Sequence, residues 1–304
     1  MKSLDRYIAA LIAAASFGGA AMGAAPALPS STAIAAKIDL AKARSLPATS
    51  KAIDCLFAEV PELKKSERLL SSTIGANARE SISSIVAAAD GFSFDGESVS
   101  LSNPATIAQG SFDTAKLAAA IKASQGAKRA KAGDIEVVSS PLTRGYWFAF
   151  PAAGTVLASS SDAGIAKIAA AAGGKASATF VSKALAADCP AVAAIDGSKG
   201  AANLSLFFGG IMKADANSIV AKITEKNPGT ARLEVEMAFA NEQLATQAFA
   251  SINGIKMLSA FKQASGKPSP ALLQRFVESD LTINGATVKL AMSATADDFA
   301  ALAK

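Results

Sequence analysis

The residues that most often carry catalysis are scarce in this chain, because its 304 residues include no histidine. Without an imidazole, Ser-His-Asp and Cys-His nucleophile systems, the usual catalytic zinc sites and histidine proton relays are excluded. A serine–lysine nucleophile needs no imidazole, but the candidates Ser182-Lys183 and Ser198-Lys199 are adjacent residues. Neighbours on a strand point to opposite faces, and neighbours on a helix do not face each other. We therefore expect no serine–lysine site.

Paired carboxylates offer a second route to hydrolysis, provided that two acids lie about 5–10 Å apart in a cleft. Glu234 and Glu236 alternate with apolar residues, which predicts the solvated face of a strand. Asp297 and Asp298 come at the start of the last predicted helix, where acids favour the helix dipole. Both pairs are therefore interpreted as structural.

Asp39 and Asp196 each end a short apolar segment, in the shared pattern Ile-Asp-x-x-Lys. They could be paired ligands related by pseudo-symmetry, but an Asx turn or helix cap after the strand is favoured. The chain has no phosphate-binding glycine loop and no calcium-binding loop. We predict no catalytic, cofactor-binding or metal-binding residue, no cofactor, and a protein that is not an enzyme.

Two segments suggest contact with a partner. The densest basic segment, 122–131, includes Lys128, Arg129 and Lys131 and could meet an acidic partner, although a solvated helix end and loop is favoured. Nucleic acid is not expected, because no aromatic residues interleave these cations. The aromatic run Tyr146 to Phe150 could line a ligand groove, but its pattern favours a core strand.

The N-terminal residues 1–27 have the layout of a secretory signal peptide. Basic residues precede an apolar run over 7–25, and small residues from Gly23 to Ala27 offer cleavage points. An uncleaved membrane anchor is the alternative, and would be the chain's one membrane contact. The first cysteine is Cys55, so a lipoprotein is not expected. We predict a periplasmic or secreted protein.

The remaining composition favours a folded, basic chain. Hydrophobic residues make up 51% and charged residues 18%, and the formal net charge is +5; this is enough apolar material for a core. In an oxidising compartment, Cys55 and Cys189 could form a disulfide, or each could be a separately buried thiol.

The sequence contains an internal repeat. Four short segments of the first half recur in the second half in the same order, each on an equivalent predicted element. The pairs are Ile38-Asp39 with Ile195-Asp196, Ser84–Ala87 with Ser218–Ala221, Ser111–Ala118 with Ala238–Ala245, and Thr155–Ser159 with Thr287–Ala291. We predict two related repeats, 28–174 and 175–304. One irregular domain with compositional echoes is the alternative.

Within each repeat, hairpins alternate with helices. Helices are expected at 49–60, 62–74, 114–124, 162–172, 178–187, 201–213, 241–264, 270–278 and 295–303. Strands are expected at 34–40, 82–90, 92–94, 97–102, 105–112, 134–139, 145–150, 154–159, 191–196, 217–225, 230–240, 280–284 and 286–293. This pattern predicts an α+β fold of two related lobes, each an antiparallel sheet with helices packed on one face.

Four segments together resemble a loose group of exported bacterial proteins that carry a duplicated domain of unknown function: Ile38–Leu40, Ser84–Gly91, Gly110–Leu117 and Val156–Ser159 before an alanine-rich helix. The resemblance would span about 33–298, and it implies export and a duplicated α+β fold without assigned chemistry. We expect a protein that binds an unknown protein or small-molecule ligand through a sheet face or between the halves. The alternatives are a hydrolase using carboxylates or Ser/Lys, and a carrier of a small apolar molecule.

Overall fold

The computed structural model describes residues 28–51, 54, 78–94, 99–111, 113–132, 134–143, 145–170, 179–199, 215–264, 271–295 and 297–298. The predicted signal peptide, Cys55, the helices expected at 62–74 and 201–213, and most of those expected at 49–60 and 295–303 lie outside these residues. None of the described helices is both long enough and apolar enough to cross a bilayer.

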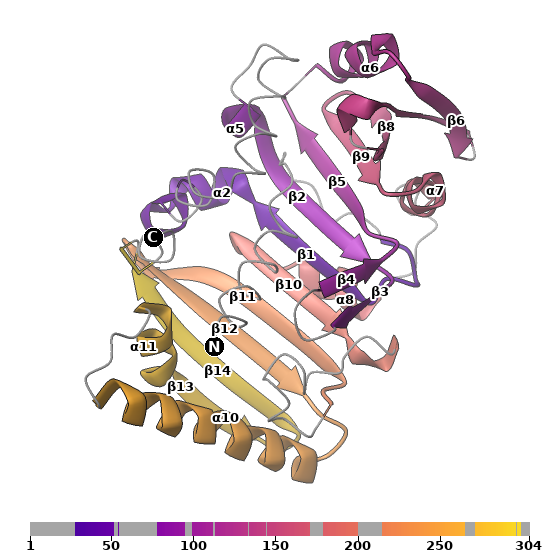
Figure 1. The fold of residues 1–304 in the computed structure, drawn as a ribbon. Coiled ribbons are helices and arrows are strands. Elements are labelled where there is room, and N and C mark those ends of the chain that lie inside the picture. The colour runs from indigo at the N-terminus through magenta and orange to yellow at the C-terminus, as the bar shows by residue number, and fades with distance from the viewer. Residues whose placement is uncertain are drawn as a thin grey trace.

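One antiparallel sheet of twelve strands organises the described residues (Figure 1). From one edge to the other its order is β13 (Asp280–Asn284), β14 (Thr287–Thr295), β12 (Thr230–Ala238), β11 (Ser218–Asn227), β10 (Ala191–Asp196), β1 (Ile34–Asp39), β2 (Ile82–Ala89), β5 (Ala105–Gly110), β9 (Thr155–Ser159), β8 (Trp147–Ala152), β7 (Ile135–Ser139) and β6 (Lys128–Ala132). A small hairpin, β3 (Gly91–Phe94) and β4 (Val99–Ser102), stands apart. The predicted α+β class is confirmed.

The prediction of two lobes with separate sheets is wrong, because β1 and β10 pair and join both halves into one sheet. At the centre of this junction Ala35 lies opposite Ala194, and they are 1% and 0% exposed. Such small side chains let the helix above pack close to the sheet. The two halves thus meet in a paired strand junction with buried side chains at its centre.

Counted outward from the junction, the first five strands of each half follow the same order, and the first half then continues with β7 and β6. The first half runs β1-β2-β5-β9-β8, and the second runs β10-β11-β12-β14-β13. A helix follows the third strand in each half: α6 (Thr114–Ala123) after β5 and α10 (Glu242–Ala264) after β12. The four sequence matches fall on these counterpart elements. This order is what internal duplication predicts, although the repeat boundaries stay a prediction.

Helices cover both faces of the sheet, and the prediction of helices on one face is wrong. Val137 packs with α7 (Asp162–Ala170), whereas its neighbour Val138 packs with α6 on the opposite side. Likewise Ala194 packs with α8 (Phe180–Leu185) and Ile195 with α10. Adjacent strand residues point to opposite faces, so the sheet has an α7/α8 face and an α6/α10 face. The other helical segments are α2 (Leu40–Ser45), α5 (Ala78–Ser81), α11 (Ala271–Val277), η1 (Pro141–Thr143) and η3 (Gly197–Lys199).

Short-range sequence signals account for a hairpin turn and for two helix caps in the structure. Asn284 and Thr287 pair at the end of the β13–β14 hairpin, and the turn between them contains the Asn284-Gly285 pair that is typical of tight hairpins. Asp113 caps α6, since its Oδ1 accepts from Lys116 N at 2.9 Å. Ser161 caps α7, because its hydroxyl accepts from the amide of Gly164.

Two surface predictions had different outcomes. Phe148 and Phe150 are partly buried and pack against the core under α6, whereas Tyr146 is 48% exposed, so the core interpretation of the aromatic run holds for the two phenylalanines and is wrong for Tyr146. Lys128–Ala132 forms the edge strand β6, so the prediction of a helix end and loop there is wrong.

Candidate functional site

A groove of about 1,060 Å³ lies on the α7/α8 face of the second half. Helix α8 forms one wall with Phe180, Lys183 and Ala184, and the floor comes from β11, β12, β14 and β13. Helix α7 covers strands of the first half on this face. Over the groove floor no helix of the described residues packs.

The floor of the groove is a grid of charges. Glu234 and Glu236 project from β12, and each holds a cation: Arg232 Nε lies 2.8 Å from Glu234, and Lys289 Nζ lies 2.8 Å from Glu236. The side chains of Glu234 and Glu236 are 50% and 53% exposed. The predicted solvated strand face is confirmed, while Val235 between them packs toward α10.

Two further lysines of the groove, Lys222 and Lys183, take no part in these ion pairs. Lys222 on β11 lies opposite Glu234 in the strand register, but Glu234 is held by Arg232. No described carboxylate forms an ion pair with Lys222 or with Lys183 of the α8 wall. The groove therefore presents two ammonium groups to a ligand, and the Asp280 carboxylate of β13 lines it as well.

Helix α8 is fixed firmly, which makes it a stable wall. Thr179 caps its N-terminus, accepting from Ser182 N at 3.2 Å. Val181 and Leu185 are fully buried against the junction strands. At the C-terminal end Lys37 of β1 donates from Nζ to the Leu185 carbonyl at 3.2 Å. A cation at this end also suits the helix dipole.

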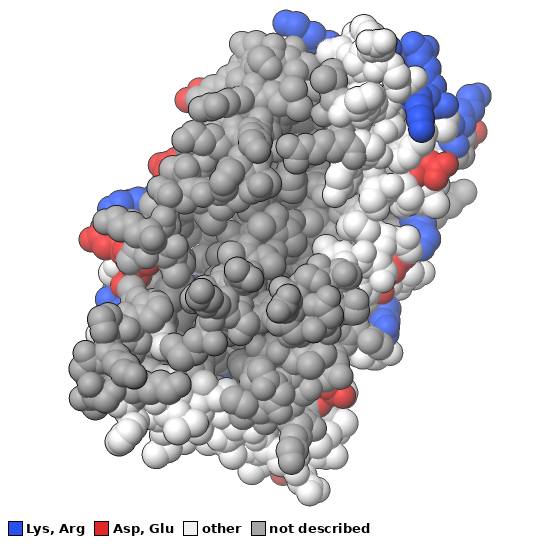
Figure 2. All heavy atoms as spheres, in the orientation of Figure 1, with Lys and Arg blue, Asp and Glu red and all other residues white. Residues whose placement is uncertain are grey.

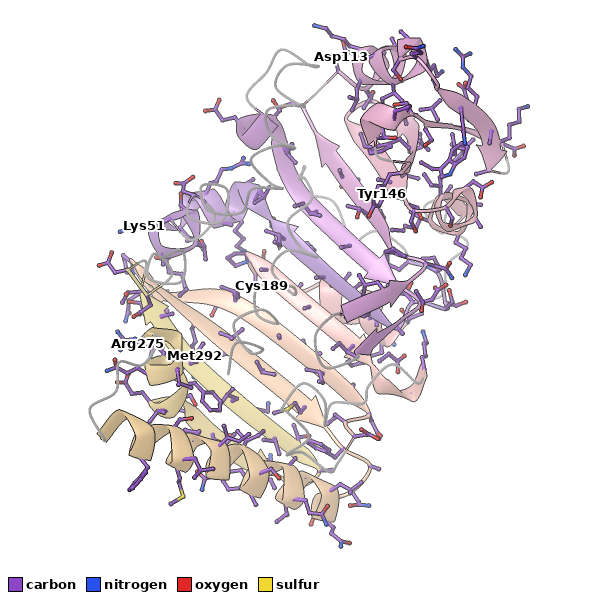
Figure 3. All side chains as sticks on the ribbon, in the orientation of Figure 1. Lys51, Asp113, Tyr146, Cys189, Arg275 and Met292 are labelled. Atoms are coloured by element: carbon purple, nitrogen blue, oxygen red, sulfur yellow. The ribbon has the colours of Figure 1, made fainter. Side chains whose placement is uncertain are left out.

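Cys189, just after α8, has a free and buried thiol. Burial raises the pKa of the Cys189 thiol, and the nearby charges of Lys222, Lys37 and Lys42 only partly oppose this. The thiol is therefore protonated at neutral pH and is a weak nucleophile. Cys189, labelled in Figure 3, comes just before the start of the central strand β10. Its proposed partner, Cys55, lies outside the described residues.

Asp39 and Asp196 lie at opposite ends of the junction and do not form a ligand pair. Asp39 Oδ1 accepts from Lys42 N at 2.9 Å and caps α2. Asp196 Oδ1 accepts from Ser198 N at 3.2 Å and from its hydroxyl at 2.5 Å. The favoured interpretation, a turn or cap after each strand, is confirmed.

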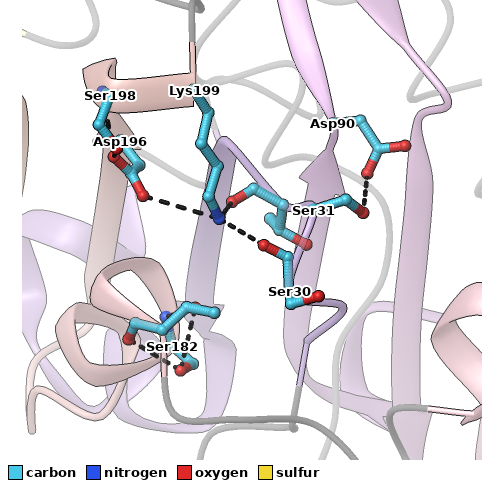
Figure 4. A network of polar contacts seen from close by, with 9 residues as sticks. Ser30, Ser31, Asp90, Ser182, Asp196, Ser198 and Lys199 are labelled. Carbon is cyan, nitrogen blue, oxygen red and sulfur yellow. Dashed lines mark hydrogen bonds and ion pairs between the residues drawn. The ribbon is translucent and has the colours of Figure 1, made fainter.

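Sequence reasoning missed the role of the lysine in the Ile-Asp-x-x-Lys pattern. Lys42 Nζ, after β1, donates to the Asp188 carbonyl at 3.2 Å, just before β10. Lys199 Nζ, after β10, donates to the carbonyls of Ser30 and Thr32 at 2.6 and 2.8 Å, just before β1 (Figure 4). The two lysines thus clamp the junction from both ends. The repeated spacing was the signal that could have revealed them.

The remaining candidate residues have structural partners. Ser182 Oγ donates to the Thr179 carbonyl at 3.0 Å, inside the α8 cap. Asp298 Oδ2 accepts from the amide of Thr295 at 2.7 Å, and Thr295 Oγ1 accepts from the amide of Asp298. This is a capping box, which confirms the structural interpretation of Asp298. Asp297 pairs with Lys51 at 2.7 Å. In the described parts of the chain, no three potential metal ligands cluster.

Asp90 ties four segments of the first half together. Its carboxylate accepts hydrogen bonds from Ser31 at 2.6 Å, Asn103 at 2.9 Å and Lys167 at 2.6 Å; Figure 4 shows the bond from Ser31. Burial raises the pKa of Asp90, but these hydrogen bonds and the Lys167 charge lower it more, so the net pKa is below the ordinary 3.8.

A carboxyl whose pKa is lower in the folded state stabilises the fold above its ordinary pKa, and this stabilisation is lost as the pH falls through the folded value. We expect Asp90→Asn to lower the urea midpoint at neutral pH, with a gap from wild type that closes below about pH 4. Urea unfolding at a series of pH values measures this gap. A gap of the same size at low and neutral pH would show that the carboxylate charge is not responsible.

Neither a protein-family model nor a curated protein matches the chain. Two solved structures of TP0453, a Treponema protein, are similar in fold. Crystal form IV has a TM-score of 0.52 at 9% identity, covering 93% of this chain and 96% of that one. Crystal form I has a TM-score of 0.48 at 10% identity, covering 93% and 97%. At this identity the likeness concerns the fold alone.

Proposed function

We propose that this chain is an exported, non-catalytic binding protein of the cell envelope or its surroundings, and that it binds its partner or ligand in the groove beside α8. The observation that carries this proposal is the groove itself, about 1,060 Å³ on the α7/α8 face of the second half. Ligand sites are typically concave and of roughly 300–1,000 Å³. Export rests on the signal-peptide pattern of residues 1–27.

The groove chemistry favours a polar ligand with an anionic group. Lys183 on the wall and Lys222 on the floor face the groove without a described carboxylate partner, and Phe180 adds an apolar surface that is 37% exposed. The paired charges on β12 and β14 offer both donors and acceptors along the floor. An extended ligand with mixed polarity fits this arrangement better than a purely apolar one.

The two alternative functions have less support. A carboxylate hydrolase needs an acid with an environment that tunes its pKa, whereas Glu234 and Glu236 are exposed and held in ion pairs. A carrier of an apolar molecule needs an enclosed apolar cavity, whereas this groove is open and its floor is charged.

Site-specific photocrosslinking in the native host tests the proposal. We expect a benzophenone amino acid at Phe180 to give a discrete adduct in the envelope fraction or culture medium, because that side chain lies in the groove. Leu101 on β4 is the matched control, since it is also 37% exposed but lies outside the groove. Adduct formation is read by gel and mass spectrometry.

Charge reversal at Lys222 provides a second control within the groove. Lys222→Glu should reduce the Phe180 adduct at least about tenfold if an anionic group binds there, since like charges across an interface cost several kcal/mol. Equal adducts from Phe180 and Leu101, or none from Phe180, would contradict binding in the groove.

A further inference from the structure

The first-half edge of the sheet carries a row of cations. β6 is the outermost strand and pairs with β7 alone among the described strands. Its side chains Lys128, Arg129 and Lys131 are all exposed. Figure 2 shows Lys and Arg side chains gathered at the margin of the molecule where Figure 1 places β6.

The three cations of β6 outnumber the nearby acids, which are Glu136 on β7 and Asp134 in the turn between the two strands. Glu136, opposite Lys131 in the register, is the single acid within β6 and β7. Glu136 is already engaged, since Lys122 Nζ of α6 lies 2.6 Å from its carboxylate. No described carboxylate forms an ion pair with the cations of β6. The edge therefore attracts negative charge.

An edge strand also has unused backbone hydrogen-bonding groups. In an antiparallel pair, alternate residues direct N–H and C=O away from the partner strand. An extended peptide can satisfy these groups by adding itself as a further strand, while its side chains meet those of the edge. β6 combines such backbone groups with cationic side chains that would complement the carboxylates of an acidic peptide.

We propose that the β6 edge binds an acidic, extended polypeptide segment as a thirteenth strand. The same cations oppose pairing between the β6 strands of two copies, because like charges directly opposite are unfavourable. The other edge strand, β13, contains Asp280 and no basic residue, so an acidic segment is repelled there. The site is at the opposite sheet edge from β13 and is separate from the groove.

Fluorescence anisotropy with two labelled octapeptides tests this proposal on the full mature chain. One peptide alternates Glu and Val, and the other alternates Glu and Pro with the same charge. Proline lacks a backbone N–H and holds φ near −65°, away from the roughly −140° of an antiparallel strand, so we expect the Glu–Val peptide to bind at least about tenfold more tightly. Binding of both peptides with equal affinity would show that only charge matters, and would overturn the proposal.

Paired charge reversals locate the site. Arg129→Glu with Lys131→Glu should weaken binding of the Glu–Val peptide at least about tenfold. Lys116→Glu with Lys226→Glu changes the net charge equally at two exposed lysines away from β6, and should change affinity less than threefold. Unchanged binding in the β6 variant, or no binding of the Glu–Val peptide by wild type, contradicts the proposal. Urea unfolding verifies that both variants fold.

Discussion

Replacing Gly154 by alanine is expected to destabilise the chain by about 2–5 kcal/mol, measured by urea unfolding. Gly154 has a positive φ of 67° in the β8–β9 turn, a conformation that costs a side-chain-bearing residue about 1–2 kcal/mol. In addition, an added Cβ would overlap the carbonyl oxygen of Gly110. Gly110 N donates to the Gly154 carbonyl at 2.6 Å, so the two backbones cannot separate without breaking this bond.

Gly145→Ala is the matched control for this substitution. Gly145 has a similar positive φ of 82°, but an added Cβ there meets no atom within 4 Å. It should therefore lose only the conformational part, about 1–2 kcal/mol. Equal losses at the two positions would show that the close approach to Gly110 is unimportant.

Truncating Leu185 to alanine is expected to cost about 2–5 kcal/mol and to weaken groove binding. Leu185 is 0% exposed and anchors α8 against the junction core, beside Val192 and Ala194. Its loss leaves a cavity under the helix that forms the groove wall. Urea unfolding gives the free energy, and the yield of the Phe180 photoadduct reports the groove.

Leu185→Met is the matched control, because it keeps the volume of the side chain. It distinguishes the loss of packed volume from the effect of any substitution at this position. Volume-conserving core changes usually cost less than about 1.5 kcal/mol, so this variant should retain most of the stability and the adduct. If Leu185→Ala lost stability but kept the full Phe180 adduct, α8 would not be the wall that positions the partner.

Helix caps and tight turns could be predicted from the sequence, because each depends on only a few neighbouring residues. The Asn284-Gly285 turn and the Asp113 cap needed only their own neighbours. Helices on both faces could also have been foreseen, because adjacent apolar pairs such as Val137-Val138 cannot both face one layer.

The pairing of strands that are far apart in the sequence could not be predicted in the same way. Ala35 and Ala194 meet at the junction, but alanine carries no signal that distinguishes one shared sheet from two. β6 was missed because lysine and alanine are depleted in strands, although charged residues are common on sheet edges. For the groove, the alternation of Glu234 and Glu236 predicted a solvated face, while nothing local placed α8 beside it.

Amide hydrogen exchange, resolved by residue, tests most directly whether the two halves share one sheet. The junction is closed at its ends by hydrogen bonds from Asp39 N to the Pro190 carbonyl at 2.8 Å and from Asp196 N to the Ala33 carbonyl at 2.7 Å. A shared sheet predicts that amides of β1 and β10 exchange at least as slowly as those of β9 and β14. Faster exchange at β1 and β10 than in both of those strands would indicate two lobes that separate, and would contradict the shared sheet.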